Sequence, residues 1–170
     1  MADPLLVTVL AIGHILSAIG WLGAGLLSGF IIGPGLQTLS APSRLEFVVK
    51  VIPKMLRYIK GMVVGTFVFG LLLLYFRFDG DFALMSPSTT FGAALSTGVA
   101  IAVIAAVLAF TVIFPSFNKM VSIAKGVLTN GGQPPPPEMT KYAERARISS
   151  MVGVLLLLIV VVMMVAAGFY

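Results

Sequence analysis

The chain has 170 residues, 59% of them hydrophobic and 10% charged, and its mean hydropathy of +1.09 excludes an ordinary soluble domain. One core of this length cannot cover so much apolar surface, so we expect lipid to be the main solvent of the protein. The net charge of +5 does not indicate nucleic-acid binding, because the basic residues flank apolar runs, and the lack of cysteine excludes disulfides and thiol chemistry.

The first predicted element is an apolar transmembrane helix over residues 5–33. Asp3 and Pro4 indicate its start, since an acidic side chain caps free backbone N–H groups and proline fits the first turn. No basic stretch precedes it and no short apolar core ends in a cleavage site, so we expect a retained helix and not a secretory signal. Three later stretches are also long enough to cross about 30 Å of hydrocarbon at about 1.5 Å per residue. They are residues 55–77, 89–114 and 146–169.

Residues 42–60, before the second span, are predicted to form an amphipathic helix. Apolar residues recur at helical spacing from Leu45 to Leu56, and basic residues occupy the opposite side. Three arrangements remain open: a helix at the membrane interface, a helix that runs into the second span across a kink at Pro53, or a continuous helix that protrudes into the cytoplasm. The basic cytoplasmic face predicted from this helix and the start of the fourth span consists of Arg44, Lys50, Lys54, Arg57, Lys60, Arg145 and Arg147.

The distribution of charge predicts how the chain crosses the membrane. Every Lys and Arg except Arg77 lies in the first or third loop or at the adjoining helix ends. By the positive-inside rule these loops are cytoplasmic, so both termini lie outside. The third span is expected to continue as a basic helix beyond Pro115, and Pro134 to Pro137 are expected to form a short polyproline spacer.

The predicted fold is therefore an all-α integral membrane protein, a single domain with four transmembrane helices in an antiparallel bundle and basic cytoplasmic helix extensions. We expect it to be a multi-pass protein of the cell (plasma) membrane. Small residues at four-residue spacing let helices approach closely, either within the bundle or between copies, and predict a homo-oligomer or a larger membrane complex. These helix-packing residues are Gly25, Gly29, Gly33, Gly61 and Gly65.

The first span carries the candidate functional residues His14, Ser17 and Trp21. Their spacing puts them on one helix face, and a titratable side chain inside the membrane is a functional candidate by default. Two interpretations stay open for each residue: a cofactor or ion pocket, or ordinary hydrogen bonding and packing. All six carboxylates lie outside or at the edges of the spans, which disfavours proton-coupled transport.

The segment from His14 to Gly23, with histidine about two turns before Trp21-Leu22-Gly23, resembles the first helix of small membrane proteins related to copper resistance protein D and the HemJ type of protoporphyrinogen oxidase. The ending Met164 to Tyr170 is similar to the last helix of these proteins. The resemblance implies a four-helix bundle that binds haem b or is linked to copper, with His14 as the metal ligand. The chain departs from the family pattern because it has no second intramembrane histidine.

Three hypotheses of function follow from the sequence. The first is a membrane protein without recognisable catalytic machinery that acts as an accessory or assembling subunit of a membrane complex. The second is a haem b- or copper-linked redox or transport protein with His14 as ligand and Trp21 lining the pocket. The third is a role at the lipid surface, because basic helices attract anionic headgroups.

Overall fold

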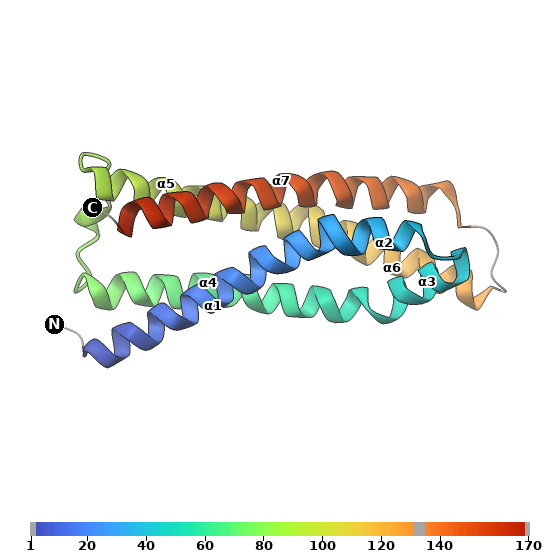
Figure 1. The fold of residues 1–170 in the computed structure, drawn as a ribbon, viewed down its shortest axis with the longest axis horizontal. Coiled ribbons are helices and arrows are strands. Elements are labelled where there is room, and N and C mark those ends of the chain that lie inside the picture. The colour runs from blue at the N-terminus through green and yellow to red at the C-terminus, as the bar shows by residue number, and fades with distance from the viewer. Residues whose placement is uncertain (1–2, 131–134, 169–170) are drawn as a thin grey trace. The chain divides into compact units, whose positions relative to one another are not determined.

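The computed structural model describes residues 3–130 and 135–168, and this part of the chain contains helices and no β-strand. Figure 1 shows the helices in chain order. They are α1 (Pro4–Leu27), η1 (Ser28–Ile32), α2 (Gly33–Gln37), α3 (Ala41–Lys50), α4 (Ile52–Arg77), η2 (Phe82–Met85), α5 (Thr90–Leu108), η3 (Ala109–Ile113), α6 (Phe114–Thr129) and α7 (Pro137–Gly168).

Four helical stretches are long and apolar enough to cross a membrane, which confirms this part of the prediction. Residues 131–134 and 169–170 lie outside the described residues. They include Pro134 of the predicted spacer, the last residue of the fourth predicted span, and the end of the segment Met164 to Tyr170. Pro137, which we expected in a polyproline spacer, is instead the first residue of α7. The stretches are Pro4–Gln37, Ala41–Arg77, Thr90–Thr129 and Pro137–Gly168.

The start of α1 follows the prediction from sequence. Asp3 Oδ1 accepts a hydrogen bond from the backbone N–H of Leu5 at 2.9 Å, and Pro4 is the first helical residue. The carboxylate thereby satisfies one N–H group that has no partner within the helix. The predicted cap at Asp3 is therefore confirmed.

A wide π-helical turn precedes a proline in two of the long helical stretches. In η1 the N–H of Gly33 donates to the carbonyl of Ser28, and Pro34 follows; in η3 the N–H of Phe114 donates to Ala109, and Pro115 follows. Proline lacks an N–H and its ring crowds the carbonyl four residues earlier, and a wider turn moves that carbonyl aside. The helix therefore continues past each proline without a break.

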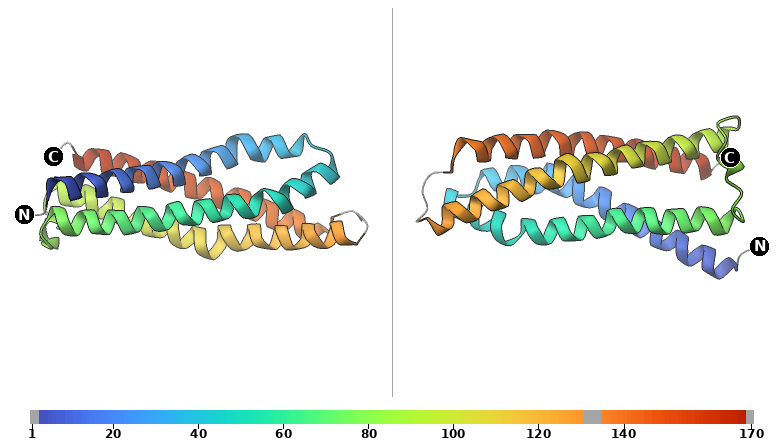
Figure 2. Two further views of the ribbon diagram at one scale, coloured as in Figure 1. Left: turned by 90° about the horizontal axis from the view of Figure 1, so that it is seen from below. Right: turned by 180° about the vertical axis from the view of Figure 1, so that it is seen from behind.

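The helix predicted over residues 42–60 divides at Val51 and not at Pro53. The N–H of Val51 closes α3 by donating to Phe47, and the N–H groups of Lys54 and Met55 both donate to the carbonyl of Val51. Pro53 then stands in the first turn of α4, where its missing N–H costs little. Figure 2 shows the course of the chain from α3 into α4 in two further views.

The described residues form two compact units, and each is considered by itself. Unit 1 comprises residues 3–23, 60–105 and 155–168, and unit 2 comprises residues 24–59, 106–130 and 135–154. In unit 1, the first part of α1 packs against α4, and Gly98 of α5 faces the side chains of Met163 and Met164 of α7.

Close packing at glycine also occurs in unit 2, where Gly25 faces Val154 of α7 and Gly153 faces Ile113 of η3. The short helix α3 lies against α6 in the same unit. Its apolar residues Leu45 and Val48 are 5% and 2% exposed, so protein and not lipid covers the apolar face of α3.

Candidate functional site

The three candidate residues of the first helix share one face of α1, in unit 1. Ser17 and Trp21 are buried and His14 is half-buried. Residues three, four and seven positions apart on an α-helix are neighbours along one side, so the structure brings the three side chains into one row. We call His14, Ser17 and Trp21 the polar row of α1.

The imidazole of His14 contacts the backbone of α4. Its Nδ1 lies 2.8 Å from the carbonyl oxygen of Thr66, and a carbonyl oxygen can only accept a hydrogen bond. Nδ1 therefore carries the hydrogen. In the neutral ring this leaves Nε2 with a free lone pair, which is the form in which histidine accepts a hydrogen bond or binds a metal.

Glycines of α4 provide the space that the polar row occupies. A methyl group added at Gly70 would lie 2.8 Å from His14 Nδ1, and one added at Gly65 would lie 2.6 Å from Ser17 Oγ. Gly13 of α1 makes the reciprocal contact, because a methyl group there would lie 2.8 Å from the ring of Phe69. The absence of side chains at these positions lets α1 and α4 approach closely.

The indole of Trp21 packs against Phe67 of α4. The two ring centroids are 6.3 Å apart and the planes are tilted by 49°. Trp21 is 6% exposed, so most of the indole is buried. This contact gives Trp21 a packing role, whatever else its N–H group binds.

Three polar atoms of the row have no hydrogen-bond partner among the described residues: His14 Nε2, Ser17 Oγ and Trp21 Nε1. Several other hydroxyl groups in the helices do have one; Thr66 Oγ1, for example, donates to the carbonyl of Met62. In the described part of the chain, Arg44 Nε is the one fully buried side-chain nitrogen or oxygen without a partner. Of the three side chains only the imidazole of His14 is half-buried, whereas Ser17 and Trp21 are 8% and 6% exposed.

Thr66 and Gly70 are contributors to this site that the sequence analysis did not identify. Both follow the small residues Gly61 and Gly65 on the same helix: Thr66 comes one residue after Gly65, and Gly70 comes five residues after it. A continued search for small residues along the second span would have found Gly70. The partner carbonyl of Thr66 has no sequence signal, since every residue has a carbonyl group.

The predicted packing glycines fall into three groups. Gly25 and Gly65 make close contacts with other helices of their own unit, to Val154 and Ser17. A methyl group added at Gly33 would meet the carbonyl of Ser28 in the preceding turn at 3.1 Å. At Gly29 and Gly61 nothing lies within 4 Å of the added methyl group.

Five of the seven residues of the predicted basic face are exposed, and Arg44 and Lys60 are half-buried. Arg44 is half-buried, and its Nη2 donates to the carbonyls of Gln37 and Leu39 at 3.2 and 3.1 Å. It therefore holds the chain between α2 and α3. Lys60 is half-buried and lies in unit 1. The exposed members are Lys50, Lys54, Arg57, Arg145 and Arg147.

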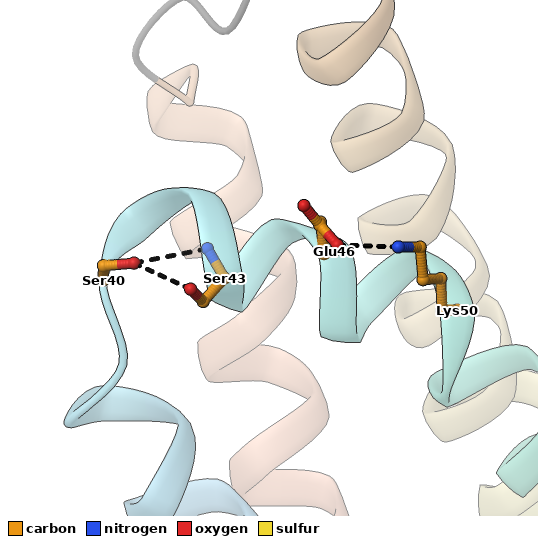
Figure 3. Close-up of polar contacts among 4 residues, drawn as sticks. All are labelled: Ser40, Ser43, Glu46 and Lys50. Carbon is orange, nitrogen blue, oxygen red and sulfur yellow. Dashed lines mark hydrogen bonds and ion pairs between the residues drawn. The ribbon is translucent and has the colours of Figure 1, made fainter.

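Figure 3 shows the polar contacts of α3. Ser40 caps the helix, since its Oγ accepts from the N–H of Ser43 at 3.4 Å, and Lys50 Nζ donates to Glu46 Oε2 at 2.7 Å. This hydrogen bond, followed by the positive charge of Lys50, lowers the pKa of the Glu46 carboxyl below its ordinary value. Both side chains are exposed, so the ion pair contributes little to stability.

The described residues contain no group of three His, Cys, Asp or Glu side chains that could hold a metal ion. The chemistry available at the polar row is thus that of one imidazole, one hydroxyl and one indole N–H. Such a set can donate and accept hydrogen bonds, or supply a single nitrogen ligand to a metal whose other ligands come from elsewhere. Comparisons with protein-family models, with curated proteins and with solved structures find no match to this chain.

Proposed function

We propose that this chain is an assembling subunit of a membrane complex, either with other copies of itself or with other membrane proteins, and that it has no catalytic machinery of its own. The observation that supports this proposal is the half-buried imidazole of His14 in the polar row of α1, whose Nε2 has no partner among the described residues. In hydrocarbon, a polar group without a partner costs several kcal/mol. A helix from another subunit would supply a hydrogen-bond partner for this nitrogen.

In this proposal the four helical stretches cross the cell membrane as an antiparallel bundle. The basic residues on α3, on α6 and at the starts of α4 and α7 face the cytoplasm, and both termini lie outside. His14 is then about three turns from the outer end of α1, within the hydrocarbon. Contacts between subunits at that depth rely on packing and on polar groups.

A second candidate function is haem b binding, in which His14 would hold the iron through Nε2. Two observations favour it: the resemblance of residues 14–23 to copper resistance protein D and HemJ-type proteins, and the hydrogen bond from His14 Nδ1 to a carbonyl, which is how metal-ligating histidines are commonly oriented. A single histidine fits haem, which brings its own four nitrogen ligands, better than a copper ion, which needs several protein ligands. Bound haem would supply one-electron redox chemistry.

The experiment that separates these functions combines an absorption spectrum with a mass measurement on the protein in mild detergent, with and without added haem b. Wild type is compared with His14→Ala and His14→Gln. The glutamine amide can still donate to the Thr66 carbonyl and form polar contacts with a neighbour, but it is a poor iron ligand.

The assembly proposal expects a colourless particle larger than one chain, smaller for His14→Ala and largely retained for His14→Gln. The haem proposal expects a Soret band that both variants lose. A colourless protein with the mass of a single chain in all three samples contradicts both proposals.

A further inference from the structure

Charge is divided unequally between the two units. The described part of unit 2 carries nine Lys or Arg residues and three acidic residues, whereas that of unit 1 carries two basic and three acidic residues. Seven of the nine basic side chains in unit 2 have no hydrogen bond or ion pair with another described residue. The seven are Lys54, Arg57, Lys119, Lys125, Lys141, Arg145 and Arg147.

Two of these cations stand together on the first turns of α4, beside an exposed aromatic hydroxyl. Lys54, Arg57 and Tyr58 are spaced by three and four residues and therefore share one helix face, and all three are exposed. Tyr58 keeps 50% of its surface exposed. We call these three residues the α4 cluster.

The helix that carries the α4 cluster belongs to the stretch Ala41–Arg77, which is long and apolar enough to cross a membrane. The whole of α4 contains no Asp or Glu. No carboxylate of this helix therefore competes for the two cations.

We propose that the α4 cluster binds the phosphate of an anionic phospholipid. Arginine can hold two phosphate oxygens with its planar fork, while lysine adds a point charge and the tyrosine hydroxyl adds a donor. Because the cluster belongs to a stretch that is apolar enough to cross a membrane, its cations are matched by the headgroup phosphate of a lipid rather than by a soluble anion.

Other basic residues of unit 2 lack this combination. Lys119 and Lys125 on α6 share their exposed side with Ser122 and Gly126 and have no exposed tyrosine beside them. On α7, Glu144 immediately precedes Arg145 and offsets part of its charge. The Lys119 and Lys125 pair therefore provides a charge-matched control.

The test measures phospholipid binding to the full chain by native mass spectrometry, after removal of endogenous lipid in mild detergent. Phosphatidylglycerol is compared with phosphatidylcholine of the same acyl chains. Wild type is expected to bind phosphatidylglycerol preferentially. Lys54→Gln/Arg57→Gln is expected to weaken this binding by about tenfold and to leave phosphatidylcholine unchanged, since each cation near an anionic headgroup contributes substantially.

The control variant Lys119→Gln/Lys125→Gln removes the same charge and should bind phosphatidylglycerol as wild type does. Equal weakening in both variants would overturn the site, because it would show general attraction to a basic protein. Absence of a preference in wild type would overturn it as well, and so would complete displacement of the lipid by inorganic phosphate. All substituted residues are exposed, and His14 is untouched, so this test is independent of the proposed assembly.

Discussion

Gly70 and Gly61 belong to the same helix but meet different surroundings, and this difference gives a prediction at the scale of single residues. Gly70→Ala puts a methyl group against the imidazole of His14, so we expect a loss of about 1–3 kcal/mol in the free energy of unfolding. Gly61→Ala has open space and should be neutral or stabilising by up to about 1 kcal/mol, because alanine favours the helix. Unfolding in mixed detergent, followed by the fluorescence of the single tryptophan, measures both.

A double-mutant cycle identifies the cause of the Gly70 effect. If the loss comes from contact with the imidazole, Gly70→Ala should cost much less in a His14→Ala background. An equal cost in both backgrounds would contradict the contact.

The ion pair on α3 predicts how one carboxyl group titrates. Residue Glu46 lies before the predicted second span, and its pKa is lowered by the hydrogen bond and the charge of Lys50. A lowered folded-state pKa means that the pair stabilises the protein fully above the unfolded-state pKa, and that this stabilisation disappears as the pH falls through the folded-state pKa. Lys50→Gln should return the pKa of Glu46 toward its ordinary value, which a carbon-13 NMR titration of the carboxyl group can follow. An unchanged titration curve would show that Lys50 does not pair with Glu46 in solution.

At the scale of elements, α3 owes its position to packing against α6. Val48 is 2% exposed, so Val48→Ala should lower the free energy of unfolding of α3 by about 1–2 kcal/mol. Val51→Ala removes the same atoms from a residue that is 38% exposed and should cost at most about 0.5 kcal/mol. Hydrogen exchange of the α3 amides measures both variants, and equal protection in the two would contradict the packing of α3 on α6.

The elements themselves could be predicted well where the sequence pattern changes. Long apolar runs gave the four helical stretches, and the alternation of basic and apolar residues gave the amphipathic helix that begins near residue 42. The break at Val51 could not be predicted, because Pro53 is compatible both with a kink and with a first helical turn. The two π turns could not be predicted either, since proline permits several ways to relieve the same clash.

Of the two helices that form the candidate site, only the contribution of α1 could be predicted from the sequence. Helical spacing alone put His14, Ser17 and Trp21 in one row. Their neighbours on α4 depend on how two helices are rotated against each other. In the apolar stretches that form these helices, nearly every face is hydrophobic, so the sequence does not indicate which face meets which.

At the scale of the whole molecule, the proposed orientation is testable because the chain contains no cysteine. A cysteine at the exposed Ser88, between η2 and α5, should react completely with a membrane-impermeant maleimide on intact cells. A cysteine at the exposed Ser122 of α6 should react only after the membrane is permeabilised. The reverse pattern would mean that the basic ends of the helices face outward and that the positive-inside rule fails for this chain.

The π turn of η1 also bears on how the glycines of the first helical stretch relate to one another. A π turn holds one residue more than an α-turn, so positions after it are shifted in phase by roughly 100° around the helix axis. Gly25 lies before this shift and Gly33 after it. The four-residue spacing of Gly25, Gly29 and Gly33 therefore does not produce one continuous stripe. A methyl group added at Gly25 would meet Val154, one at Gly29 would meet open space, and one at Gly33 would meet the preceding turn. A periodic motif that is counted through a wide turn joins two different faces of the helix.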